Sequence, residues 1–150
     1  MDRLINKYSR KLVSQKICDN GKPIFGVLDE ITRWSSGGEE VQVLESVMQR
    51  LSINSILFSP AAEPYRSILD YLADHSTDTN GRIKPDDTET RTFLHDIPVA
   101  QNFSTSEILK GLMQRKGVII PGCGIVTYGA VSPEQAFVTY SSICFSSFVK

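Results

Sequence analysis

The pattern of apolar and polar residues switches between helical and strand periodicity along most of the chain. Apolar residues at helical spacing predict amphipathic helices, and short β-branched runs predict strands. The expected helices cover Asp2 to about Ile17, Glu39–Leu51, Ala61–Ala73, Ser104–Lys116 and a last helix that begins after Ser132. The expected strands cover Pro23–Leu28, Ile53–Phe58, Arg91–Val99, Val118–Ile120 and Ile125–Tyr128. This alternation predicts a single α/β domain, residues 1–150, in which helices cover a sheet.

The segments between these elements carry turn and capping signals. Arg33–Gly38 and the polar segment Asp74–Glu89 are expected to be loops. Ser104 with Glu107, and Ser132 with Gln135, have the spacing of capping boxes at two helix starts. Gly117 is expected to end the helix that begins after Ser104. The last helix is apolar on more than one face, which indicates either burial on all sides or contact with another subunit.

Composition narrows the class of protein. The chain has 150 residues, of which 41% are hydrophobic and 22% charged, as in ordinary globular domains. A formal net charge of −1 gives no sign of a nucleic-acid or membrane surface. No apolar run reaches the ~18 residues of a membrane span, and the charged N-terminus lacks the apolar core of a signal peptide. We therefore expect a cytoplasmic protein that has neither nucleic acid nor membrane as a partner.

Three widely spaced cysteines do not form a disulfide framework or a structural zinc motif. Cys18 and Cys144 fall on apolar helix faces and are expected in the core. Cys123 lies between Gly122 and Gly124, in a tight turn that pushes its side chain outward. The residues alone leave three readings open for Cys123, namely a nucleophile, a metal ligand, or a small side chain in a tight corner.

Two further groups of residues could carry chemistry. The backbone N–H groups of Gly37 and Gly38, at a helix start, could bind an anion, although Glu39 would oppose it unless its side chain is protonated or turned away. His75 and His95 have no metal-binding spacing. The acidic side chains of segment 86–89 could bind a cation or could simply be solvated.

The last third of the chain resembles the class II aldolase/adducin family, which contains zinc-dependent sugar-phosphate aldolases and epimerases together with adducin head domains. In that family, a strand ends in an Asn-His-Gly or His-His-Gly turn, a strand ending in Gly follows, and a helix begins near Leu/Pro-Glu-x-Ala. The sequence VIIPGCGIVTYGAVSPEQAF has this layout. Asp96–Val99 is similar to the family's preceding strand. Further upstream, Ser36–Glu39 and Asn54–Leu57 occupy the places of its Ser-Ser-Glu and Asn-Ala-Val-Val motifs.

The resemblance implies a three-layer fold with a mainly antiparallel sheet, shortened at the N-terminus, and a homo-oligomer. The family's three zinc histidines fall on Phe58, Pro60 and Cys123, so zinc could not be held in the family's manner and no metal or cofactor is expected. The family's acid/base glutamate falls on Glu39.

Two functions follow from this resemblance. The leading hypothesis is a metal-free pseudoenzyme with a binding or assembly role, which retains a site for a small anionic ligand at Ser36, Gly37 and Gly38. The alternative is a lyase- or epimerase-like enzyme with a rebuilt site, in which Cys123 and Glu39 act on a small phosphorylated or carboxylated carbohydrate. In that case the fold would bring a histidine near Cys123.

Overall fold

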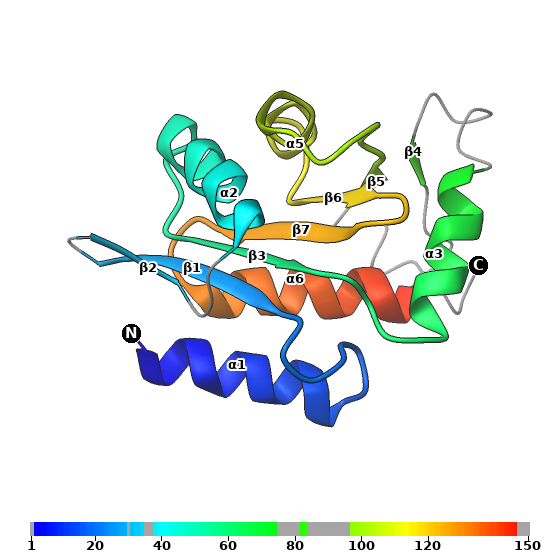
Figure 1. Ribbon diagram of the computed structural model, residues 1–150, viewed down its shortest axis with the longest axis horizontal. Helices are drawn as coiled ribbons and strands as arrows, with labels where there is room; N and C mark the ends of the chain where they lie inside the picture. The colour runs from blue at the N-terminus through cyan, green and yellow to red at the C-terminus, as the bar shows by residue number, and fades with distance from the viewer. Residues whose placement is uncertain (1, 30, 35–37, 75–81, 84–96, 147–150) are drawn as a thin grey trace.

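A five-stranded sheet separates two layers of helices (Figure 1). The computed structural model describes residues 2–29, 31–34, 38–74, 82–83 and 97–146. The sheet contains β1 (Ile24–Asp29), β2 (Ile31–Trp34), β3 (Ser55–Ser59), β6 (Gly117–Ile120) and β7 (Gly124–Gly129). Its strand order is β2-β1-β3-β7-β6, and every neighbouring pair is antiparallel. The predicted three-layer α/β fold with a mainly antiparallel sheet is therefore confirmed.

Helices cover both faces of this sheet. In Figure 1, α2 (Glu39–Arg50) and α5 (Thr105–Leu112) lie over one face, and α6 (Pro133–Ser146) lies under the other. The outermost element on the α6 side is α1 (Asp2–Ser14), and α3 (Tyr65–Asp74) contacts α6. A small ladder of β4 (Arg82–Ile83) and β5 (Ile97–Pro98) completes the described elements. Within the described ranges, no helix is long and apolar enough to cross a membrane.

The core consists of two clusters, one on each face of the sheet, because successive strand residues point to opposite faces. In β3, Leu57 belongs to the cluster between the sheet and helices α6 and α1, whereas Ile56 and Phe58 belong to the cluster between the sheet and helices α2 and α5. All five residues of β3 are buried, so this strand is the centre of the molecule.

The apolar character of α6 comes from its position inside the molecule. Tyr140, Ile143 and Cys144 are fully buried, and α6 packs against both the sheet and α1. The sequence left two explanations for the apolar faces of this helix, burial within its own chain or contact with another subunit. Burial within its own chain explains Tyr140, Ile143 and Cys144. Val138 and Phe145 remain exposed on its outer side.

Local signals placed several boundaries correctly. Ser104 caps α5 by accepting a hydrogen bond from the Glu107 backbone N–H at 3.3 Å. The Gln135 side chain accepts hydrogen bonds from the backbone N–H groups of Val131 and Ser132, at 2.8 and 3.4 Å, at the start of α6. Both capping predictions therefore identified real helix starts.

Two boundary predictions were wrong at helix ends. The first helix ends at Ser14, because Lys16 has a positive φ of 62° and the Ile17 N–H turns back to the Leu12 carbonyl. Gly117 does not end α5, which stops at Leu112; it starts β6. A Cβ at Gly117 would lie 2.8 Å from Ile143 Cδ1, so the glycine serves close packing against α6.

A third prediction was wrong at a helix start. The helix expected from Ala61 begins at Tyr65, because the Ala62 N–H donates to the Ile17 carbonyl at 2.7 Å. This bond ties the residues before α3 to the turn after α1, outside the helix.

The predicted loop Arg33–Gly38 was also wrong in part. Arg33 and Trp34 belong to β2, which forms a hairpin with β1. The Trp34 ring lies over Gly26, where a Cβ would approach ring carbons to 2.4 Å. This contact joins two strands, and the sequence of either strand alone does not reveal it.

Several predictions lie outside the described residues. These are the predictions for Ser36, Gly37, His75 and His95, for the acidic segment 86–89, and for the strand at residues 91–96. The rest of that strand is described, with Ile97–Pro98 in β5 and Val99 bridging Ile119.

The hairpin contact leads to a first prediction. Gly26→Ala should lower the free energy of unfolding by about 1–3 kcal/mol, because the added methyl displaces the Trp34 ring. Trp34 is the only tryptophan, so its fluorescence should shift in the same variant. Urea denaturation followed by circular dichroism measures the stability change.

A double-mutant cycle supplies the control for this experiment. In a Trp34→Ala background the ring is absent, so Gly26→Ala should cost much less. If Gly26→Ala lowers the free energy of unfolding equally in both backgrounds, its effect does not come from contact with the Trp34 ring.

Candidate functional site

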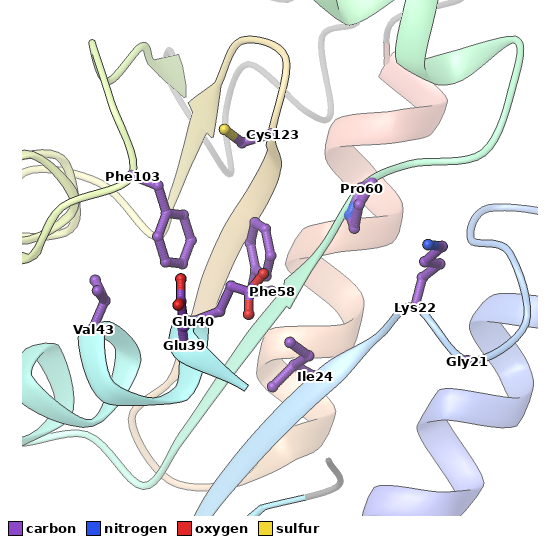
Figure 2. Close-up of a pocket in the computed structure, with 10 residues that line it drawn as sticks. All are labelled: Gly21, Lys22, Ile24, Glu39, Glu40, Val43, Phe58, Pro60, Phe103 and Cys123. Carbon is purple, nitrogen blue, oxygen red and sulfur yellow. The ribbon is translucent and has the colours of Figure 1, made fainter. Parts of the chain in front are cut away.

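A cavity of about 620 Å³ opens where α2 begins, β1 begins and β3 ends (Figure 2). The β6–β7 turn completes its wall. The lining residues are Gly21, Lys22, Ile24, Glu39, Glu40, Val43, Phe58, Pro60, Phe103 and Cys123. Its volume lies in the range of small-molecule sites.

The end of β3 and the β6–β7 turn meet because β7 pairs with β3 in register. Ser59 pairs with Ile125, and the chain turns one residue earlier, at Gly124. Gly124 has φ +155°, and a Cβ there would lie 2.6 Å from the Ser59 carbonyl oxygen. This close approach places Cys123 on the same cavity wall as Pro60.

The buried phenol of Tyr140 fixes the Ser59 carbonyl from the other face of the sheet. Tyr140 Oη donates to this carbonyl oxygen at 2.7 Å, and both residues are fully buried. Burial raises the pKa of the Tyr140 phenol well above its usual value, so the hydroxyl remains a donor. The bond therefore anchors the strand end that carries Phe58 and Pro60.

The four positions that the sequence resemblance assigns to the family's acid/base glutamate and zinc histidines line this one cavity. Glu39, Phe58, Pro60 and Cys123 all line it, although they come from three separate parts of the chain. Gly38 lies next to Glu39 as the N-cap of α2. Glu39 and Cys123 thus line the same cavity, and their catalytic role remains a prediction.

The donor atoms in the cavity do not suit a zinc ion. The side chains of Phe58 and Pro60 have no atom that can coordinate zinc. Of the three positions assigned to zinc histidines, only Cys123 therefore carries a side chain that could act as a ligand. Throughout the part of the chain that the structure describes, no three His, Cys, Asp or Glu side chains gather closely enough to hold a metal ion.

Two aromatic side chains, Phe58 and Phe103, pack against each other in the wall of the cavity. The rings of Phe58 and Phe103 pack with centroids 4.7 Å apart at an interplanar angle of 57°, a tilted arrangement that aromatic rings favour. Sequence reasoning missed Phe103. Its position next to the cap residue Ser104, where apolar side chains pack against the helix, was the available signal.

The charged residues lie at different sides of the cavity. Glu39 and Glu40 are exposed in the first turn of α2, and Lys22 is exposed before β1. Figure 2 shows the two glutamates on one side of Phe58 and Lys22 on the other. A Glu40 carboxylate oxygen lies 2.9 Å from the position of a Cβ on Gly38, so this carboxylate covers the positive end of the helix.

A second cavity of about 190 Å³ lies beside the β6–β7 turn and shares Pro60 and Cys123 with the first. Arg66 and Asp70 line it from α3. The Gly122 N–H donates to Asp70 Oδ1 at 3.4 Å. Cys123 is therefore open to two cavities.

The fold is that of class II aldolase-like proteins. Solved structures with this fold include L-fuculose-1-phosphate aldolase from Thermus thermophilus, at a TM-score of 0.74 and 14% identity over 98% of this chain and 91% of that one. A second L-fuculose 1-phosphate aldolase matches at a TM-score of 0.77 and 14% identity over 99% and 82%. A sugar-phosphate aldolase from Thermotoga maritima matches at 0.67 and 10% identity over 97% and 90%.

These likenesses establish the fold of the chain. No protein-family model matches its sequence, and no curated protein does. The activities named for the three structures belong to those proteins.

The environments of the three cysteines lead to a second prediction. Burial raises the pKa of the Cys18 thiol, and it raises that of the Cys144 thiol well above its usual value, whereas Cys123 is exposed. In the native protein, one thiol per chain should react with a disulfide reagent, and the other two should react at least about a hundredfold more slowly.

Cys123→Ser is the control, and it should remove the fast thiol. Native reaction of two or three thiols at similar rates would contradict the assignment.

The Tyr140–Ser59 bond leads to a third prediction. Tyr140→Phe should lower the free energy of unfolding by about 1–2 kcal/mol, because it leaves a buried carbonyl without its donor. Tyr8→Phe is the matched control, since Tyr8 is also buried but its hydroxyl forms no hydrogen bond within the described residues. Equal stability changes in denaturant titrations of the two variants would show that the Tyr140 bond contributes nothing specific.

Proposed function

We propose that this protein is a metal-free, class II aldolase-like protein that binds a small molecule in the larger cavity and carries out no aldol chemistry. One observation carries this proposal. The positions matching the family's catalytic residues converge on one cavity, and among them only Glu39 keeps the family's residue type.

Loss of zinc removes the main source of charge stabilisation in the family's reaction. A metal acting as a Lewis acid contributes several kcal/mol to a transition state that develops negative charge. A carboxylate such as Glu39 can exchange a proton, but it cannot stabilise a neighbouring anion. The apolar rings of Phe58 and Phe103 offer no replacement charge.

Binding requires less of the cavity than catalysis does. Its volume accommodates a small molecule, and the Phe58–Phe103 pair supplies an apolar wall with polar groups around it. The anionic part of the ligand would lie at Lys22, the cation that lines the cavity within the described residues. Homo-oligomeric assembly and a cytoplasmic location stay predictions.

The alternative, an enzyme with a rebuilt site, draws support from the exposure of Cys123 in the same cavity as Glu39. It requires a base near the thiol. Alkylation of Cys123 separates the two functions, because it should abolish turnover of a carbohydrate substrate by a cysteine enzyme. A binding protein has no turnover to lose.

The correspondence with the zinc positions leads to a fourth prediction. Wild-type protein should bind no stoichiometric zinc, whereas the triple variant with Phe58→His, Pro60→His and Cys123→His should bind about one zinc ion per chain. Zinc analysis after dialysis, together with calorimetric titration, measures both.

The variant with Phe58→Ala, Pro60→Ala and Cys123→Ala is the matched control, and it should remain free of zinc. Stoichiometric zinc in the wild type, with an aldolase activity that a chelator abolishes, would overturn the proposal. If a folded triple-histidine variant fails to bind zinc, the three positions do not have the geometry in which three histidines could share one zinc ion.

A further inference from the structure

The cavity has a negative side, formed by two consecutive carboxylates. Glu39 and Glu40 both line it from the first turn of α2, and both are exposed. The N-cap, Gly38, provides no side-chain hydrogen bond, and the Glu40 carboxylate lies close to it. Within the described residues, neither glutamate forms an ion pair. This side of the cavity therefore attracts a cation and repels an anion.

An aromatic surface lines the same cavity as these carboxylates. It consists of the packed rings of Phe58 and Phe103, which Figure 2 draws together with Glu39 and Glu40. An aromatic face attracts an organic cation within about 6 Å of its centroid. Carboxylates beside aromatic rings therefore suit a protonated amine better than they suit a hydroxyl group.

The opposite side of the cavity carries a positive charge. Lys22 lies beyond Phe58 and Pro60 in Figure 2, and its ammonium group forms no ion pair within the described residues. Next to it, no heavy atom of the described residues, apart from those of Gly21 and its chain neighbours, lies within 4 Å of the place that a Cβ on Gly21 would take, so a ligand group can approach the backbone there. An ammonium group on a flexible stem binds a phosphate or a carboxylate as a point charge.

We propose that the cavity selects a small zwitterion, with a protonated amine at Glu39 and Glu40 and a phosphate or carboxylate at Lys22. This inference rests on the proposed binding function and names its ligand class. A sugar phosphate without an amine would satisfy Lys22 and leave Glu39 and Glu40 without a cationic ligand group. The two unpaired charged sides, separated by an apolar wall, favour a ligand that carries both charges.

Calorimetric titration at low ionic strength tests this proposal with four probes that differ in their charges. Glucosamine 6-phosphate carries an amine and a phosphate, and glucosaminic acid carries an amine and a carboxylate. Glucose 6-phosphate lacks the amine, and glucosamine lacks the anion. At least one zwitterion should bind about tenfold or more tightly than both singly charged probes, and the better zwitterion identifies the anionic group.

Charge-neutral variants then assign each end. Glu39→Gln combined with Glu40→Gln should remove the preference for the amine, so that glucose 6-phosphate binds as tightly as glucosamine 6-phosphate. Lys22→Gln should remove the preference for the anion and leave glucosamine binding unchanged. Glu45→Gln and Lys16→Gln are the matched controls, since neither residue lines the cavity, and both should preserve the wild-type ratios.

Equal binding of glucose 6-phosphate and glucosamine 6-phosphate by the wild type would overturn the inference. Unchanged ratios in the charge-neutral variants would overturn it as well. If none of the probes binds but another compound slows alkylation of Cys123, the zwitterion proposal fails and the binding function stands. If no compound slows that alkylation and the triple-histidine variant also fails to bind zinc, the binding function fails with it.

Discussion

The contact between the Gly124 backbone and the Ser59 carbonyl is the constraint on which the site depends. The turn after β6 reaches the end of β3 because residue 124 has no side chain, and a Cβ there would meet the Ser59 carbonyl oxygen and the Phe58 ring. From the other face of the sheet, the Tyr140 phenol holds the same carbonyl by a buried hydrogen bond. The two contacts fix the strand end from both sides, so Phe58, Pro60 and Cys123 share one wall.

The central position of β3 constrains the strand end that carries Phe58. The strand is buried along its whole length and pairs with β1 and β7, so movement of its end would disturb both pairings. Phe58 belongs at once to the core cluster under α2 and α5 and to the cavity wall. The aromatic pair thus stabilises the fold at Phe58, one of the three positions that the sequence resemblance assigns to zinc histidines.

The elements that depend on local chemistry could be predicted, and those that depend on contacts between distant segments could not. Helix starts at Ser104 and Ser132 followed from capping residues, because such signals lie within four residues of chain. The strand β2 was missed because the Trp34–Gly26 contact that defines its pairing joins two strands. In the site, Glu39 and Cys123 followed from their motifs, whereas Phe103, Glu40 and Lys22 enter it only through the fold.

The cavity combines a buried apolar wall with exposed charged residues at its rim, and these two parts differ in how freely they can be substituted. Its apolar wall is part of the core, so a substitution there changes stability together with binding. Glu39, Glu40, Lys22 and Cys123 are exposed, and their replacement leaves the packing around β3 intact. A chain with this architecture can therefore change its ligand through rim residues while the core stays constant. Under the proposed binding function, the charge pattern of the rim, rather than the shape of the wall, would then distinguish the ligand of this protein from those of other proteins with the same fold.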